Sequence, residues 1–277
     1  MIDLPINQII CGDNCEVMRQ MPSESIDLVV TSPPYDDLRT YGGYSWDFYG
    51  VAWNLKRLIR QGGVIVWVVA DATVDGDETG TSMRQALHFK EIGLRLHDTM
   101  IYQRDGCRFP ETNRYYPVWE YMFVLSKGKP IAVNLLEDRK NKQHGDKIAS
   151  STQRERDGRL SKVSCAKTNP SKTVKEFGVR FNTWVYSCGN GKSTSDSYAF
   201  KHPATYPEKL ARDHILSWSN EGDIVLDPFS GSGTTAKMAR DNGRRYIGIE
   251  INKDYVGLST KRLAQGVLPI FENREVE

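Results

Sequence analysis

Short apolar runs alternate along most of the chain with stretches whose apolar residues recur at helical spacing. The clearest run, Val64 to Val69, is almost entirely apolar, as expected for a strand that is buried on both faces. Ile26 to Val30 and Tyr246 to Glu250 are shorter runs of the same kind. The alternation predicts an α/β fold built on a doubly wound, mostly parallel sheet, and an antiparallel pair at one edge is left open.

Glycines and prolines mark the expected ends of the helical stretches. Pro22 should end the first helix, Gly62 and Gly63 the second, and Gly93 the third. Strands are expected at residues 7–11, 26–30, 64–69, 94–103, 119–125, 181–186, 223–229 and 246–250, and helices at 15–21, 51–61, 81–92 and 253–265 and ahead of Trp218 and Asp241.

The pattern breaks down in the middle of the chain. Between Glu137 and Arg180 apolar residues become rare, and 12 Lys and Arg residues face 6 Asp and Glu residues. Such a stretch is commonly a solvated insertion, yet phosphate binding also needs a local basic excess on adaptable backbone. We therefore divide the chain into residues 1–136, a segment of residues 137–195, and residues 196–277.

Composition limits the remaining classes. The 277 residues can form one substantial core, and a net charge of +2 confines any nucleic-acid surface to a local patch. The five cysteines are scattered without a Cys-x-x-Cys pair, so no metal site is expected. The N-terminus has no basic, apolar leader, and no stretch approaches a membrane helix, which makes the cytoplasm the default location.

The strand that begins at Ile26 ends abruptly in Thr31-Ser32-Pro33-Pro34-Tyr35. Two prolines fix the backbone and remove two donors, so that the carbonyls are left to accept from another group. A double proline is often only a loop. Here the product is a rigid ledge with a hydroxyl, carbonyl acceptors and an aromatic ring, which suits gripping a planar base by its amine.

A second motif, Asp227-Pro228-Phe229-Ser230-Gly231-Ser232-Gly233-Thr234-Thr235, joins a strand to a helix through a tight glycine turn. Ala236 fits a phosphate-binding fingerprint, so the glycines alone leave a dinucleotide open. Asp227 argues against it, because a carboxylate repels phosphate but attracts the α-ammonium of a methionine moiety. Glu250 ends the next strand, where a carboxylate that binds ribose hydroxyls is expected.

Together the ledge and the glycine loop resemble the amino-methylating DNA methyltransferases, which transfer a methyl group from S-adenosylmethionine to N4 of cytosine or N6 of adenine. The resemblance covers most of the chain outside the middle segment. Because the ledge precedes the loop, the order is that of the permuted β group. It implies a Rossmann-like, circularly permuted fold, whose first strand lies near residue 225 and whose fourth lies near residue 28.

The resemblance also implies roles for single residues. In the catalytic ledge of Ser32, Pro33, Pro34 and Tyr35, the hydroxyl of Ser32 and the Pro33 carbonyl would accept from the amine, while Tyr35 stacks on the base. Asp13 would lie near the adenine of the cofactor, and His202 would be structural. The expected cofactor-binding residues are Asp13, Thr31, Asp227, Phe229, Gly231, Gly233, Thr234, Thr235 and Glu250.

The implied substrate is double-stranded DNA, from which the target base must be flipped before its amine can react. Residues 36–44 could close over that base, although an exposed loop explains them equally well. In the family, the middle segment reads the DNA sequence, and its expected phosphate-binding residues are Arg154, Arg156, Arg159 and Lys162. A cognate restriction endonuclease is a conceivable partner, and the chain could act as a monomer or a homodimer.

The target base depends on one position. Family members that methylate adenine N6 usually have Asp first in the ledge, and those that methylate cytosine N4 usually have Ser. Ser32 therefore favours cytosine, with adenine as the alternative. An RNA or protein methyltransferase would share the glycine loop, a dinucleotide oxidoreductase would leave the ledge unexplained, and a DNA-binding module without activity would need only the basic segment.

Overall fold

The computed structural model describes residues 4–36, 45–106, 112–147, 151–163, 173–187, 189, 192–194, 196, 199 and 206–265. The chain forms two compact units. The first consists of Met1–Asn134 and Asn182–Glu277, and the second of Leu135–Phe181. None of the helices in the described ranges is both long and apolar enough to cross a membrane.

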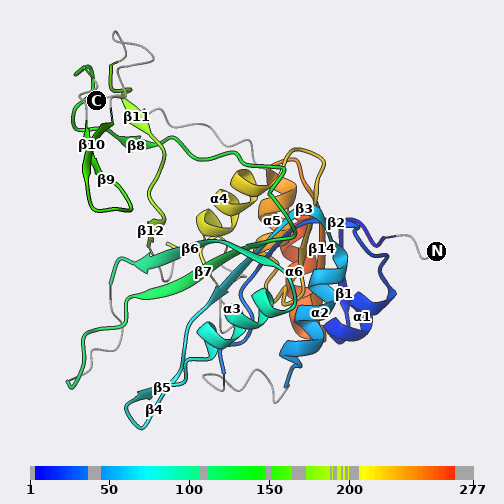
Figure 1. Ribbon diagram of the computed structural model, residues 1–277. Coiled ribbons are helices and arrows are strands. Elements are labelled where there is room, and N and C mark those ends of the chain that lie inside the picture. Colours follow the sequence, from blue (N-terminus) through cyan, green and yellow to red (C-terminus); the bar gives the residue numbers. More distant parts are fainter. Residues whose placement is uncertain are drawn as a thin grey trace. The chain divides into compact units, whose positions relative to one another are not determined.

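A single eight-stranded sheet organises the first unit (Figure 1). Its order is β1-β14-β13-β2-β3-β7-β6-β12. β7 is antiparallel to both β3 and β6, while all other neighbours are parallel. The strands are β1 (Gln8–Cys11), β2 (Ile26–Thr31), β3 (Ile59–Val69), β6 (Arg95–Arg104), β7 (Trp119–Ser126), β12 (Thr183–Tyr186), β13 (Ile224–Asp227) and β14 (Arg245–Glu250).

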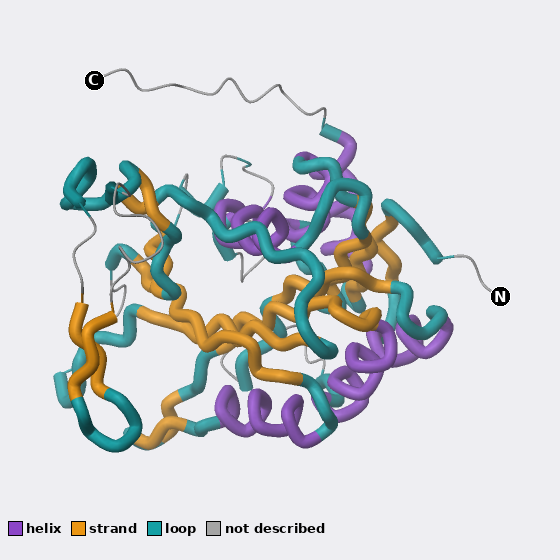
Figure 2. Tube along the Cα trace, turned by 45° about the horizontal axis from the view of Figure 1, so that its top comes forward, coloured by secondary structure: helices purple, strands orange, loops and turns teal. Residues whose placement is uncertain are grey.

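Helices cover both faces of this sheet, so the predicted doubly wound α/β fold is confirmed. Figures 1 and 2 show α1 to α3 on one face and α4 to α6 on the other. The helices are α1 (Asn14–Gln20), α2 (Phe48–Leu58), α3 (Thr81–Glu91), α4 (Glu208–Trp218), α5 (Thr234–Asp241) and α6 (Lys253–Ala264), and a small hairpin is formed by β4 (Thr73–Val74) and β5 (Asp77–Glu78).

The strand order explains how the two motifs come together. Counted from β13, the chain continues into β14, and the third and fourth strands of the cofactor unit are β1 and β2. The spatial order is then 3-2-1-4, as in a dinucleotide-binding sheet whose chain has been cut between its second and third strands. β13 pairs directly with β2, through Val225 with Leu28 and Leu226 with Val29. The ledge and the glycine loop therefore follow adjacent parallel strands.

The expected antiparallel pair lies inside the sheet rather than at its edge. β7 is the reversed strand, and two further strands, β6 and β12, follow it before the sheet ends. Because β7 runs against its neighbours, its first residues lie at the edge where the parallel strands end. This reversal places Trp119 and Glu120 on the same edge as the ledge.

The second helix ends earlier than predicted. α2 stops at Leu58, and β3 begins at Ile59 and includes both glycines that were expected to terminate the helix. A Cβ on Gly63 would lie 2.7 Å from Ile59 Cγ1 and 2.9 Å from the Asp27 carbonyl oxygen. The glycine therefore lets the strand pass close to β2, a role that sequence alone does not separate from helix termination.

The second unit is built from short antiparallel pairs. β8 (Arg139–Lys140) pairs with β11 (Phe177–Gly178), and β9 (Ser151–Arg154) forms a hairpin with β10 (Leu160–Val163). The predicted segment of residues 137–195 extends beyond this unit at its C-terminal end. The reason is that β12 pairs with β6 in the large sheet of the first unit.

Candidate active site

The ledge and the glycine loop meet at a buried hydrogen bond. Thr31, the last residue of β2, donates from Oγ1 to Asp227 Oδ1 over 2.7 Å, although 196 positions separate the two residues. Both side chains are buried. The carboxyl ends of the neighbouring parallel strands bring them to the same edge of the sheet. The predicted proximity of the two motifs is thus confirmed.

The glycine loop folds tightly over this edge. The Gly231 N–H donates to Glu250 Oε2 over 2.8 Å, which ties the turn to the end of β14. Gly233 has a φ of 77° and is the N-cap of α5. A Cβ there would lie 2.9 Å from Ser259 Cβ. Only glycine satisfies both the left-handed backbone and this close approach.

Asp227 is a buried acid at the centre of the site. Its side chain is only 2% exposed, and burial raises its pKa to about 6. Hydrogen bonds from Thr31 and from the Phe229 N–H partly oppose this effect, while the nearby Glu250 adds to it. Burial disfavours the charged form, so Asp227 would ionise more readily beside a cation.

Glu250 has a similar environment with a different geometry. Burial raises its pKa, while its two oxygens accept from the backbone N–H groups of Gly231 and Asn252. Those bonds fix the orientation of the carboxylate. Neither Glu250 nor Asp227 forms a salt bridge with any residue that the structure describes. Two buried acids without a cationic partner suit a ligand that brings a positive charge and hydroxyl groups.

Asp13 lies at the neighbouring strand end. It follows β1, which pairs with β14, and Gly12 N–H donates to the Glu250 carbonyl over 3.0 Å. Asp13 also caps α1, since its Oδ1 accepts from the Glu16 N–H over 3.0 Å. The helix cap accounts for one carboxylate oxygen. A contact with a cofactor through the other remains a prediction.

Thr234 and Thr235 direct their hydroxyl groups into the protein. Thr235 Oγ1 donates to the Val30 carbonyl over 3.1 Å and also contacts the Tyr206 hydroxyl. Thr234 Oγ1 accepts from Arg262 over 3.0 Å. The two side chains therefore hold the turn in place, and a contact with a cofactor would have to come from their backbone. Phe229 packs edge-on against Trp46, with 4.9 Å between the ring centroids.

The ledge itself is a polar network as well as a rigid turn. Ser32 Oγ lies 2.8 Å from the Tyr35 hydroxyl. Pro33 is buried and Pro34 is half-buried. Among the described residues, none donates a hydrogen bond to the Pro33 carbonyl, which leaves that oxygen available as an acceptor.

Glu120 is a residue of this network that the sequence did not reveal. The Tyr35 hydroxyl donates to Glu120 Oε2 over 2.9 Å. Glu120 is the second residue of β7, and Arg104 Nη1 lies 3.9 Å from its Oε1. The available signal was an acid at the start of a predicted strand. It could not be used without knowing that this strand runs against its neighbours.

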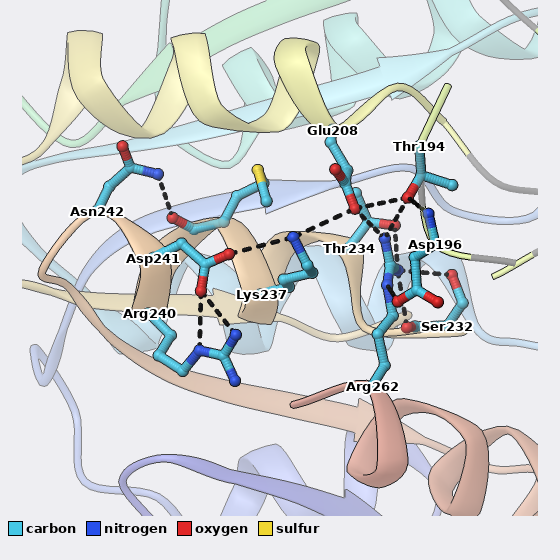
Figure 3. Close-up of polar contacts among 11 residues, drawn as sticks. Thr194, Asp196, Glu208, Ser232, Thr234, Lys237, Arg240, Asp241, Asn242 and Arg262 are labelled. Carbon is cyan, nitrogen blue, oxygen red and sulfur yellow. Dashed lines mark hydrogen bonds and ion pairs between the residues drawn. The ribbon is translucent and has the colours of Figure 1, made fainter. Parts of the chain in front are cut away.

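Arg262 is a second residue that the sequence did not reveal (Figure 3). Its side chain is completely buried and forms ion pairs with Asp196 and Glu208. Its Nη1 also donates to the Ser232 carbonyl and to Thr234 Oγ1, each over 3.0 Å. Arg262 thus connects α6 and the start of α4 to the glycine loop, and it holds the turn from behind.

The predicted phosphate-binding arginines lie in the β9–β10 hairpin of the second unit. Arg154, Arg156 and Arg159 are exposed. Arg159 forms an ion pair of 2.6 Å with Asp157, and its hydrogen bonds lower the pKa of that carboxyl. Arg154 donates to the Gly158 carbonyl over 2.9 Å, and Lys162 is part of β10. Arg159 is therefore partly neutralised, whereas Arg154 and Arg156 form no salt bridge with a described residue.

Two other predictions concern residues outside the described ranges. They are the structural role of His202 and most of the closing loop of residues 36–44. Asp36, the first residue of that loop, is described. Its carboxylate accepts from Ala72 N–H and Thr79 Oγ1. Burial alone would raise its pKa, but these hydrogen bonds outweigh it and lower the pKa.

Comparison with known proteins identifies related sequences over most of the chain. A family model described as DNA methylase, which covers N6 and N4 methyltransferases, matches residues 26–261. The orphan methyltransferase M.BamHII of Bacillus amyloliquefaciens is 58% identical over 245 residues, which are 88% of this chain and 91% of that protein. The DNA adenine methyltransferase YhdJ of Escherichia coli (strain K12) is 27% identical over 270 residues, or 92% and 82% of the two chains.

Among solved structures, the DNA modification methylase TTHA0409 of Thermus thermophilus, in complex with S-adenosyl-L-methionine, has the same fold. The TM-score is 0.61 at 24% identity, and the match covers 95% of this chain and 97% of that one.

Proposed function

The chain belongs to the DNA methylase family of N6 and N4 methyltransferases, and on this premise we propose that it methylates an exocyclic amine of a base flipped from double-stranded DNA. S-adenosylmethionine is the methyl donor. The proposed target is N4 of cytosine. The observation that carries the proposal is the buried Thr31–Asp227 hydrogen bond, because it joins the base-gripping ledge to the glycine loop. Methyl transfer requires their two ligands to lie side by side.

The ledge acts by orienting the amine. Ser32 Oγ and the Pro33 carbonyl accept its N–H bonds and draw the nitrogen out of the plane of the base. Its lone pair is then directed at the methyl group, and no covalent intermediate with the enzyme is needed. Holding the two reactants in this geometry contributes much of the rate, and the fixed acceptors stabilise the developing charge. Tyr35 is proposed to stack on the base.

The residues of the glycine loop fit the methyl donor. When bound, S-adenosylmethionine supplies an electrophilic methyl group on a sulfonium centre. Asp227 would attract its ammonium group, and this attraction relieves the burial that raises the pKa of the acid. Glu250, oriented by Gly231 and Asn252, would accept from the ribose hydroxyls. Asp13 would accept from the adenine amine, and Gly231 and Gly233 leave room for the ligand.

We also propose that the chain belongs to the permuted β group of the family. Its ledge at residues 31–35 precedes its cofactor loop at residues 227–235. The sheet order, in which β13 and β14 are the first two strands of the cofactor unit and β1 and β2 the next two, supports this assignment.

The identity of the methylated base can be measured directly. We expect nucleosides from DNA treated with the protein and S-adenosylmethionine to contain N4-methyldeoxycytidine, because Ser32 replaces the stronger carboxylate acceptor. Mass spectrometry of the digested DNA decides the outcome, and DNA treated without the methyl donor is the control. N6-methyldeoxyadenosine alone would support the adenine alternative, to which the relative YhdJ points. Label on RNA or protein but not on DNA would contradict the proposal.

The second unit is proposed to contact the DNA backbone, and salt dependence tests this role. We expect replacing Arg154, Arg156 and Arg159 by Ala to reduce the slope of log affinity against log salt by about 2–3, because each neutralised phosphate contributes about 0.9. Arg159 should contribute least, since Asp157 already pairs with it. Fluorescence anisotropy with labelled DNA measures the slope.

The matched control for that experiment removes three basic residues that lie elsewhere. Lys90 and Lys261 are exposed near the ends of α3 and α6, and Arg245 is exposed at the start of β14. All three lie toward the edge of the sheet opposite the ledge. Their replacement by Ala should leave the slope unchanged. An equal change in both triple variants would show that the hairpin makes no particular contribution.

A further inference from the structure

We infer that Glu120 is a positioning residue for methyl transfer, acting on the ledge through the Tyr35 hydroxyl. The inference rests on the proposed function of the ledge and extends it to a residue of the reversed strand β7. It supplies the carboxylate that the ledge itself lacks at Ser32.

Three atoms form a continuous hydrogen-bonded chain. Ser32 Oγ lies 2.8 Å from the Tyr35 hydroxyl, which lies 2.9 Å from Glu120 Oε2. The Glu120 side chain is only 14% exposed, and the guanidinium of Arg104 is 3.9 Å away. A largely buried carboxylate beside a cation is held in one orientation, and here that orientation is toward the phenol.

The direction of each hydrogen bond follows from the number of protons. Tyr35 has one hydroxyl proton, and it is donated to Glu120. In the Ser32–Tyr35 bond the phenol oxygen must therefore accept, and Ser32 must donate. With its own proton committed, Ser32 Oγ faces other groups as an acceptor only. Glu120 thus sets the hydroxyl of Ser32 in the state that an amine N–H requires.

The same chain strengthens Ser32 as an acceptor. Hydrogen bonds in series polarise one another, and the effect is larger where water is excluded. A bond to an ionised group is about twice as strong as a neutral one. The charge of Glu120 therefore pulls the phenol proton, the phenol pulls the serine proton, and electron density increases on Ser32 Oγ. A serine ledge gains in this way part of the effect of a carboxylate.

The chain also offers a route for the proton that the reaction releases. As the new N–C bond forms, the C–S electron pair remains on sulfur, and the amine nitrogen becomes positively charged with both its protons. One N–H bond must then break. Its proton can pass to Ser32 Oγ as the serine proton passes to the phenol oxygen and the phenol proton passes to Glu120. The net result is a neutral methylated amine and a protonated Glu120, with no other reactant consumed.

A double-mutant cycle tests this inference on the full-length protein. We expect Glu120→Gln to lower kcat for DNA methylation by roughly tenfold or more, within the range of groups that assist proton transfer. KM for DNA and for S-adenosylmethionine should change less than about twofold, because Glu120 contacts neither ligand. Tyr35→Phe, which removes the hydroxyl and keeps the ring, should lower kcat at least as much. The double variant should be no slower than Tyr35→Phe, since the two groups act in series.

Glu78→Gln is the matched control. Glu78 is an exposed acid of the β4–β5 hairpin that pairs with Arg114 over 3.5 Å, and its removal should leave kcat unchanged. A Glu120→Gln variant with the kcat of the wild type would overturn the inference. So would a loss of kcat that persists in full when Glu120→Gln is added to Tyr35→Phe, because Glu120 would then act by another route.

Two further readouts keep the conclusions separate. If Glu120→Gln unfolds, as circular dichroism would show, the Tyr35→Phe variant still decides, because wild-type kcat in that variant excludes a role for the hydroxyl. If the wild-type protein methylates no exocyclic amine in DNA, the proposed function itself is wrong. The inference about Glu120 fails alone when the wild type is active and the cycle is additive.

Discussion

Replacing Arg262 with Ala should lower the free energy of unfolding by about 3–5 kcal/mol, the typical cost of breaking a buried ion pair. The guanidinium is completely buried and pairs with both Asp196 and Glu208. Its loss would leave two acids without their principal cation and would release the Ser232 carbonyl and the Thr234 hydroxyl. Since whole domains are stable by only about 5–15 kcal/mol, such a loss would be a large fraction of the total.

Urea denaturation measures this change, and Lys261→Ala is the control. Lys261 is the preceding residue on α6 and is exposed, so its replacement has a similar effect on helix propensity without breaking the buried pairs. Equal midpoints for the two variants would mean that the buried network contributes little. We further expect Glu208→Gln to recover part of the stability of Arg262→Ala, because it removes one of the uncompensated acids.

The Asp227→Asn variant should be more stable than the wild type at neutral pH yet bind the methyl donor more weakly. The ordinary pKa of an aspartate is 3.8, and burial raises that of Asp227 to about 6. A difference of about two pKa units corresponds to about 3 kcal/mol, which is the upper limit of the gain. The amide oxygen of Asn can still accept from Thr31 and from the Phe229 N–H, both of which bond the same carboxylate oxygen.

The pH dependence of that gain has a definite sign. Below about pH 4 Asp227 is protonated in the folded and the unfolded states, so the variant should have no electrostatic advantage. As the pH rises toward 6, the unfolded state loses its proton first, and the wild type becomes less stable relative to the variant. Above about pH 6 the difference should be constant. Urea unfolding at pH 5 and pH 8 without ligand measures it, and a difference that does not depend on pH would contradict the assignment.

Binding of the methyl donor should move in the opposite direction. Loss of a charge-assisted contact costs about 1.5–3 kcal/mol, or roughly ten- to a hundredfold in affinity. Calorimetric titration of Asp227→Asn at pH 8 measures this loss. In the wild type the ionised acid is the binding form, so the affinity should also fall as the pH drops below about 6. Wild-type affinity in a folded variant would remove Asp227 from the binding site.

The local pattern was sufficient for most of the secondary structure. The run from Val64 to Val69 was identified as a buried strand because nearly every residue in it is apolar, and the turn before α5 because its closely spaced glycines favour a tight turn. The same glycine signal was misleading at Gly63. A glycine that ends a helix and one that lets two strands approach look alike until the neighbouring strand is known.

The sequence by itself determined the chemistry of the two motifs: a ledge with two prolines, a glycine turn preceded by Asp227, and Glu250 at the next strand end. Those properties depend on residue type and on spacings of a few residues, which a linear pattern preserves. Only the tertiary structure decided that Thr31 bonds Asp227, that Glu120 reaches Tyr35, and that Arg262 is buried behind the loop. Each of these facts depends on which strands are neighbours, on the direction of β7, or on exclusion from water. Burial that raises a pKa and pairs that form across the sheet arise only when distant segments pack together.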